Sequence, residues 1–229
     1  MCGRFRLKRL DRLAESFQAW DEIEAVPRVN IAPTEPVVTV RQEAGKPRRI
    51  KMMRWGLIPA GSLDESVGNS MINARSETLT QRISFAHLLD TNRCLIPADG
   101  FYEWQKAGKV KQPFCFVMPN EDLFAFAGLW DAWKNPQGKI IDSCVIITAP
   151  PNSLLEQFHD RMPVIVTPEN YAEWMNPEIK FDAVKHLLKP YAGKMNEHPV
   201  STELNNAQNK KLDLDSPVAP EVPAQASLF

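Results

Sequence analysis

The second residue of the chain is a cysteine, and a position so close to the start gives it a chemistry that internal cysteines lack. A small second residue permits removal of Met1, which would leave Cys2 with an α-amine and a thiol on neighbouring carbons. The reference pKa is about 7.7–8.0 for the amine and about 8.5 for the thiol, so both are partly nucleophilic near neutral pH. The amine can form an imine with an aldehyde, and the thiol can close on the imine carbon to give a thiazolidine. Cys2 is therefore a candidate covalent nucleophile for aldehydes; the alternative is a chance cysteine.

A carboxylate enclosed by aromatic residues is a second candidate. The segment Pro97-Ala-Asp-Gly-Phe-Tyr-Glu-Trp104 places Glu103 between bulky rings, and in an extended segment Phe101 and Glu103 share one face. Apolar surroundings raise the pKa of a carboxyl group, which suits a general acid–base. The alternative is a surface glutamate on an amphipathic strand.

Two further segments carry polar groups that could assist. In His159-Asp-Arg-Met-Pro163, a histidine beside an acid and a base could donate a proton, or be structural. In Ile72-Asn-Ala-Arg-Ser-Glu77, Asn73 could orient another group and Arg75 could bind phosphate. The alternative for the second segment is a polar surface turn.

Charge and motif content exclude several function classes. The net charge is −1, yet residues 1–60 hold twelve Lys or Arg against seven Asp or Glu, which allows a local basic groove or an ordinary solvated face. Phosphate-binding glycine loops, the Gly-x-Ser-x-Gly elbow and His-Glu-x-x-His are absent from the sequence. The four cysteines show no Cys-x-x-Cys spacing, so we expect no metal, and no nucleotide or other cofactor.

The elements that must position these residues are predominantly short strands. Apolar periodicity predicts a helix over 8–19, and proline and asparagine predict a loop over 26–35. Strands are predicted at 36–42, 48–55, 93–98, 113–118, 123–129 and 140–148. Ser153 and Glu156 fit a capping box, and further helices are predicted at 168–175 and 180–189. These elements predict an α+β fold with a curled, barrel-like mixed sheet rather than a doubly wound parallel one.

The expected boundaries are one domain over 2–211 and a disordered tail over 212–229, which is rich in proline, alanine and serine. The start of the chain lacks an apolar run of signal length, and no window approaches a membrane span. We therefore expect a cytoplasmic protein without a membrane partner, and we expect it to be monomeric.

Six ordered motifs together resemble the SRAP family, the SOS-response-associated peptidase proteins that shield abasic DNA. The resemblance spans roughly residues 2–206, with Val200-Ser-Thr and Asn205-Asn206 following the six. The motifs are Met1-Cys-Gly-Arg-Phe, Asn30-Ile-Ala-Pro-Thr34, Arg54-Trp-Gly-Leu-Ile-Pro59, Asn73-Ala-Arg-Ser-Glu77, Pro97 to Trp104 and His159-Asp-Arg-Met-Pro163. The fold that the resemblance implies is a strand-rich, bifurcated mixed sheet that forms a pseudo-barrel with peripheral helices.

The resemblance also implies residue roles. Cys2 would be the nucleophile that crosslinks to DNA, Asn73 would position it, Glu103 would be the general acid–base, and His159 would assist opening of the sugar. The expected contacts to the DNA backbone come from Arg4, Asn30, Arg75 and Arg161. The resemblance also implies association with the nucleoid when the protein is bound to damaged DNA.

Two positions depart from the family pattern. After Pro59, a basic stretch with a tryptophan is common, whereas this chain has Ala60-Gly-Ser-Leu-Asp-Glu-Ser66. Glu203 stands where an arginine is common. Both changes predict weaker contacts to DNA.

The resulting hypothesis is covalent capture of abasic sites in single-stranded DNA by a Cys2 thiazolidine after removal of Met1. Strand cleavage by a weak lyase activity could branch from the imine. Two alternatives stay open: a cysteine peptidase or self-processing hydrolase that releases its own Met1, and a non-covalent single-stranded-DNA-binding protein.

Overall fold

The computed structural model describes residues 2–107 and 110–219, and strands dominate it. The strands are β1 (Phe5–Leu7), β2 (Arg28–Ile31), β3 (Pro36–Arg41), β4 (Arg49–Trp55), β5 (Asn73–Arg75), β6 (Arg93–Ala98), β7 (Gly100–Ala107), β8 (Val110–Val117), β9 (Phe124–Lys134), β10 (Ile140–Ala149), β11 (Met162–Pro163), β12 (Ile165–Val166) and β13 (Asn196–Pro199). The α-helices are α1 (Leu13–Phe17), α2 (Ile83–Ala86), α3 (Tyr171–Met175) and α4 (Phe181–Val184). Within the described ranges, no helix is long and apolar enough to cross a membrane.

The larger sheet closes on itself. Strand β10 pairs with β4, β4 with β3, β3 with β6, β6 with β9, and β9 returns to β10, so these strands form a closed barrel. The pairing of β10 with β4 is parallel, whereas the others are antiparallel, so the barrel is mixed. Closure removes exposed sheet edges, and the barrel interior is filled by apolar side chains.

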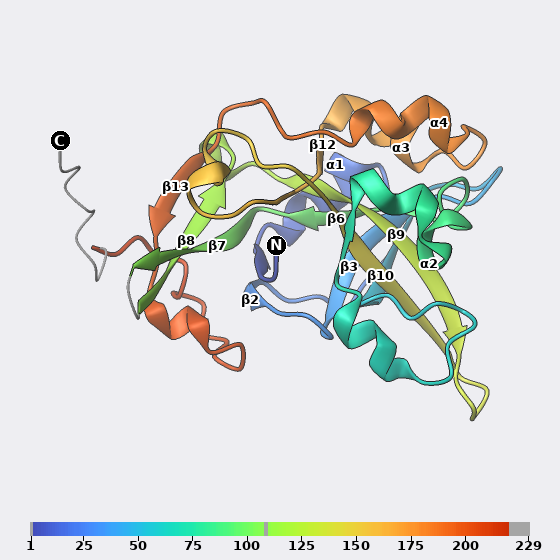
Figure 1. Cartoon of the computed structure of the whole chain (residues 1–229), viewed down its shortest axis with the longest axis horizontal. Helices are drawn as coiled ribbons and strands as arrows, with labels where there is room; N and C mark the ends of the chain where they lie inside the picture. Colours follow the sequence, from blue (N-terminus) through green and yellow to red (C-terminus); the bar gives the residue numbers. More distant parts are fainter. Residues whose placement is uncertain (1, 108–109, 220–229) are drawn as a thin grey trace.

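A second sheet, in the order β13-β8-β7-β1-β2, branches from the barrel. The branch lies where β6 ends at Ala98 and β7 begins at Gly100, so that one stretch of chain contributes a strand to each sheet. Figure 1 shows β7, β8 and β13 extending to one side of β3, β9 and β10, with α3 and α4 along one edge. The predicted α+β class, with a strand-rich, bifurcated sheet forming a barrel, is confirmed.

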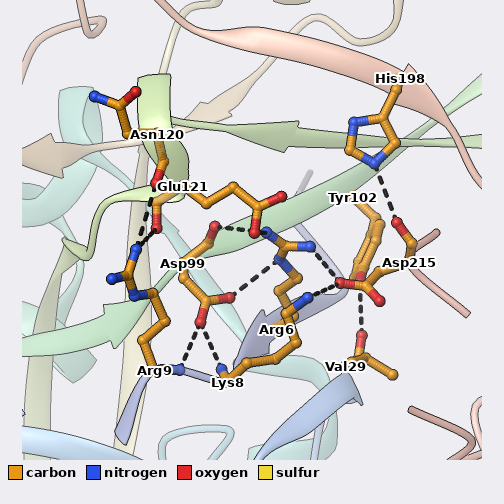
Figure 2. Close-up of polar contacts among 10 residues, drawn as sticks. All are labelled: Arg6, Lys8, Arg9, Val29, Asp99, Tyr102, Asn120, Glu121, His198 and Asp215. Atoms are coloured by element: carbon orange, nitrogen blue, oxygen red, sulfur yellow. Dashed lines mark hydrogen bonds and ion pairs between the residues drawn. The ribbon is translucent and has the colours of Figure 1, made fainter. Parts of the chain in front are cut away.

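The residue between the two strands, Asp99, is completely buried. Its carboxylate accepts hydrogen bonds from the backbone N–H groups of Lys8 and Arg9, at 2.5 and 2.9 Å, and lies 3.1 Å from Nε of Arg6 (Figure 2). These bonds satisfy backbone donors that would otherwise be buried without partners. Asp99 therefore fastens the end of β1 to the branch point.

Aromatic rings fill the junction of the two sheets. The ring of Phe5 on β1 lies 5.2 Å from that of Trp55 and 5.6 Å from that of Phe126, both on barrel strands. Phe101 on β7 stacks on Phe116 at 5.3 Å and also meets Phe126. These contacts bury a large apolar area and fix β1 and β7 against the barrel.

The predicted strands lie close to the observed ones, but several local predictions were wrong. The helix over 8–19 is a 3-10 turn, η1 (Leu10–Arg12), followed by α1, which ends before Gln18 in a left-handed conformation. The loop over 26–35 contains strand β2. The predicted helices at 168–175 and 180–189 are present, each as a 3-10 turn joined to a short α-helix: η6 (Pro168–Asn170) with α3, and α4 with η7 (Lys185–Leu187).

Two further expectations near the C-terminal half need correction. Ser153 does not cap the turn η5 (Leu155–Gln157); instead the side chain of Asn152 accepts from the N–H of Leu155 at 3.0 Å. The predicted tail starts too early, because Leu214 and Asp215 are buried and Pro217 pairs with Val200. Residues 220–229 of that tail lie outside the described part.

The wall of the barrel is tightly packed at Gly128 on β9. A methyl group added there would lie 2.9 Å from Sγ of Cys94 and 3.0 Å from the carbonyl oxygen of Val145, and backbone cannot move aside cheaply. We expect Gly128→Ala to lower the free energy of unfolding by about 1–3 kcal/mol in urea titrations. Gly61→Ala, with no atom within 4 Å of the added methyl, should unfold within about 0.5 kcal/mol of the wild type. Equal stability of both variants would contradict the packing described.

Candidate active site

Cys2 lies immediately before β1 and is fully buried. Its carbonyl oxygen accepts a hydrogen bond of 2.8 Å from Nδ2 of Asn73 on β5. Burial raises the pKa of the Cys2 thiol well above its usual range, and the negative charge of nearby Glu103 raises it further. The structure therefore brings together three of the residues that the sequence singled out.

Glu103 lies on β7 with 3% of its surface exposed. It is paired across the ladder with Phe114 on β8, and the ring of Phe114 lies 4.9 Å from that of Phe158. Burial raises the pKa of Glu103 to about 7, and the charge of Asp160 contributes in the same direction. Glu103 is therefore a buried carboxyl group rather than a surface glutamate, and its role as a general acid–base stays a prediction.

His159 follows η5 and is half-buried. Its Nδ1 lies 2.6 Å from Oδ1 of Asp160 and 3.0 Å from the backbone nitrogen of Arg161. Nδ1 either donates to the Asp160 carboxylate or accepts from the N–H of Arg161, depending on which ring nitrogen carries the proton, and either bond holds the imidazole from the same side.

A pocket of about 920 Å³ lies between Glu103 and His159, and both residues line it. It is lined by Gly3, Arg4, Glu103, Trp104, Gln105, Lys111, Gln157, Phe158, His159, Asp160 and Asn205. Cys2 is not part of this lining but adjoins Gly3, which is. The pocket thus gives an open approach to the face of β7 that carries Glu103.

Arg4 lies immediately before β1 and lines this pocket. Its Nη1 donates to Oδ1 of Asn30 at 2.6 Å and to the carbonyl oxygen of Leu204 at 2.8 Å. The guanidinium carbon lies 5.8 Å from the centre of the Trp104 ring, within the range of a cation–π contact. Arg4 is therefore held as an oriented cation at the pocket wall.

Asn30, expected at the DNA backbone, is directed inward on β2 and has 1% of its surface exposed. Besides accepting from Arg4, it donates from Nδ2 to the carbonyl oxygens of Asn206, at 3.1 Å, and Asn209, at 2.7 Å. Its side-chain groups are all engaged within the protein, so what it does here is to position Arg4.

The other two arginines differ from each other in exposure. Arg161 is buried and forms a two-pronged ion pair with Glu77, at 2.5 and 2.9 Å, and also donates to the carbonyl oxygen of Thr148 at 2.6 Å. Arg75, on β5 two residues after Asn73, is exposed. Neither lines the pocket.

Sequence reasoning did not assign Trp104, Lys111, Asp160 or Asn205 to the site. The indole Nε1 of Trp104 donates to Oδ1 of Asn205 at 2.6 Å, which joins β7 to the turn η8 (Thr202–Asn205). The proximity of Asn205 to Trp104 across a hundred residues has no local signal. Lys111 could have been found from the hairpin that pairs β7 with β8.

The two departures from the family pattern lie outside this pocket. Residues 60–66 are anchored by Asp131, which accepts from the N–H of Ala60 at 2.8 Å, and they leave Leu63 almost fully exposed. Glu203 is exposed and pairs with Lys211 at 2.9 Å. Among the residues described, no cluster of three His, Cys, Asp or Glu could hold a metal ion.

Comparison with known proteins shows which family has this sequence and fold. A family model described as SOS response associated peptidase (SRAP) matches residues 1–207. Abasic site processing protein YoqW from Bacillus subtilis (strain 168) is 43% identical over 221 residues, which covers 93% of this chain and 98% of YoqW. Abasic site processing protein YedK from Escherichia coli (strain K12) is 31% identical, covering 95% of this chain and all of YedK.

Solved structures agree on the fold. A crystal structure of a protein from Bacteroides thetaiotaomicron has a TM-score of 0.87 at 22% identity and covers 95% of this chain and 100% of that one. Another, from Bordetella bronchiseptica, has a TM-score of 0.75 at 26% identity and covers 87% of this chain and 100% of that one. The order of the motifs, the fold and the match over nearly the whole domain show that this chain belongs to the SOS response associated peptidase (SRAP) family.

Proposed function

We propose that this chain processes abasic sites in single-stranded DNA by covalent capture through Cys2 after Met1 has been removed. The observation that carries the proposal is the placement of Cys2 beside the buried Glu103, at a pocket of about 920 Å³. The names of the relatives, abasic site processing proteins, support the substrate. An abasic sugar already lacks its base, so it can enter such a pocket without base flipping.

The first chemical step opens the sugar and forms an imine. Glu103, with a pKa of about 7, can both donate and accept a proton near neutral pH. His159 at the pocket wall hydrogen-bonds the ring oxygen and assists its opening to the aldehyde. The Cys2 amine then adds to C1′, and Glu103 protonates the departing hydroxyl, so that one water leaves and an imine forms.

The second step closes the ring. The Cys2 thiol adds across the imine, so that sulfur bonds to C1′ and the thiol proton passes to the nitrogen. No redox change, metal or nucleotide is required. The imine carbon is the electrophile for the thiol, so imine formation comes first; burial raises the pKa of the thiol and disfavours its thiolate. Asn73 holds the Cys2 carbonyl and thereby orients both nucleophiles.

The DNA backbone is held by phosphate contacts around the pocket. Arg4 and Lys111 are part of its wall, and Arg75 is exposed on β5 near Asn73. Trp104 offers a ring for base stacking, which tolerates any sequence. We assign Asn30 and Arg161 supporting roles, because their side chains bind Arg4 and Glu77.

The nucleophile can be tested with an abasic single-stranded oligonucleotide and denaturing gels. We expect wild type to form a covalent adduct, Cys2→Ala to form none, and Cys94→Ala, a matched change at another buried cysteine, to react as wild type. Cys2→Ser and Cys2→Ala both keep the amine without the thiol, so in both variants the imine cannot close to a thiazolidine and should cleave the strand more than wild type does. Lesion-independent binding by Cys2→Ala with no wild-type adduct would favour the non-covalent binding alternative.

The free amine is a separate requirement. Protein that retains Met1, or carries an N-terminal tag, has an amide at the Cys2 nitrogen and should form no adduct. Removal of the tag by a protease that leaves Cys2 first should restore the reaction, with intact mass checked in each sample. If release of Met1 occurs in the purified protein and stops in Glu103→Gln, the self-processing alternative gains support.

The pH dependence of the adduct rate tests Glu103. The protonated fraction of Glu103 falls as pH rises through about 7, whereas the free fraction of the amine increases up to about 8. We expect a bell-shaped profile for wild type. Glu103→Gln should lose the decline at high pH and react about a hundredfold more slowly at pH 7. The exposed Glu156→Gln on η5 is the control, and an unchanged profile in Glu103→Gln would exclude the assigned role.

A further inference from the structure

The segment 208–219 lies beyond the residues that the family model matches, and it folds back onto the second sheet. Leu214 has 2% of its surface exposed and packs with Val29, Tyr102 and Val200. The N–H of Val218 donates to the carbonyl oxygen of Pro199 at 3.0 Å. The segment is therefore an integral part of the sheet that carries Glu103.

Asp215 is the charged residue of this segment that enters the protein interior, with 4% of its surface exposed. Its carboxylate forms ion pairs with the guanidinium of Arg6 and with Nζ of Lys8, the latter at 2.6 Å (Figure 2). Its carbonyl oxygen lies 3.1 Å from Nε2 of His198 on β13. Asp215 thus links the edge strand β13 to β1 and to Lys8, the residue that follows β1.

Strand β1 needs this support because its own pairing is short. It has three residues, and its ladder with β7 comprises the pairs Phe5–Phe101 and Arg6–Gly100. Its register with β2 is irregular between Phe5 and Leu7. Cys2 precedes the strand and is held by Asn73, so a shift along β1 would move Cys2 relative to Glu103.

We infer that Asp215 is a positioning residue for the Cys2 reaction, because its buried ion pairs with Arg6 and Lys8 fix β1 and so place the nucleophile beside Glu103. The inference rests on the proposed function. Arg6 retains Asp99 at 3.1 Å and Glu121 at 3.0 Å when Asp215 is neutralised. Asp215→Asn, which has nearly the same shape, therefore loosens β1 without leaving the buried guanidinium unpaired.

The test compares Asp215→Asn with Asp213→Asn, an exposed carboxylate in the same segment. Full-length chains with Met1 removed are mixed with increasing abasic single-stranded DNA, and the maximal rate constant and half-saturating concentration of adduct formation are measured. We expect the maximal rate constant of Asp215→Asn to fall about tenfold, since displacement of a reacting group slows reaction steeply, with half-saturation changed less than about twofold. Asp213→Asn should match wild type in both.

A merely structural role gives a different result. Partial unfolding of Asp215→Asn would lower the final amount of adduct and leave the rate constant of the folded fraction unchanged, and that outcome would overturn the inference. A wild-type chain that forms no adduct would instead refute the proposed function. The labelling experiment below would still show whether Asp215 holds β1 in position.

Alkylation of Cys2 by an uncharged maleimide reports the position of β1 without DNA. Cys2 is fully buried, so the rate of its labelling, followed by mass spectrometry of the N-terminal peptide, reports how firmly the segment before β1 is held. We expect Cys2 of Asp215→Asn to react severalfold faster than in wild type or Asp213→Asn, while Cys94 and Cys144 react at the same slow rate in all three. Equal labelling of Cys2 in all three proteins would overturn the inference.

Discussion

The guanidinium group of Arg6 is enclosed at the fork where the second sheet leaves the barrel, and the geometry around Cys2 depends on that enclosure. Such a cation is costly to bury unless carboxylates accompany it. Asp99 comes from the branch point, Glu121 from the turn η4 (Pro119–Glu121), and Asp215 from the C-terminal segment. Because the three arrive from distant parts of the chain, the cluster determines how β1, the branch and the last segment fit together more than it adds to stability.

The site has a solvent-accessible part, which is the pocket, and a buried part. The pocket is bordered by groups suited to phosphates and bases, such as Arg4, Lys111 and Trp104. Cys2, which adjoins the pocket, and Glu103, which lines it, lie in surroundings that raise the pKa of both. Burial is the largest cause of the shift at Glu103, and the same carboxyl group in water would be ionised at neutral pH. A carboxyl group that is partly protonated near neutral pH therefore borders the pocket.

The sequence predicted those features that depend on neighbours along the chain. Strand β10 contains the apolar run Cys144-Val-Ile-Ile147, and the rings flanking Glu103 indicated its burial. Predictions from the sequence were wrong where the local structure depends on contacts between residues that lie far apart in the chain. The sequence around Asn30 predicts a loop, because this residue lies between prolines. The structure has strand β2 there, and the hydrogen-bond partners of the Asn30 side chain lie near residues 206–209, so no local signal indicates them. Asp215 lies in a proline- and serine-rich stretch that indicates disorder, and its burial depends on Arg6, more than two hundred residues away.

The hydrogen bonds of Arg4 to Asn30 and Leu204 have a consequence for the timing of synthesis. Cys2 is among the first residues to leave the ribosome, whereas the contacts of its neighbour Arg4 require residues near the end of the chain. At about 5–20 residues per second, the first residues wait roughly 10–40 s before the last of these partners exists. During that interval the N-terminus is open to enzymes that remove methionine, and only afterwards does the folded domain enclose it.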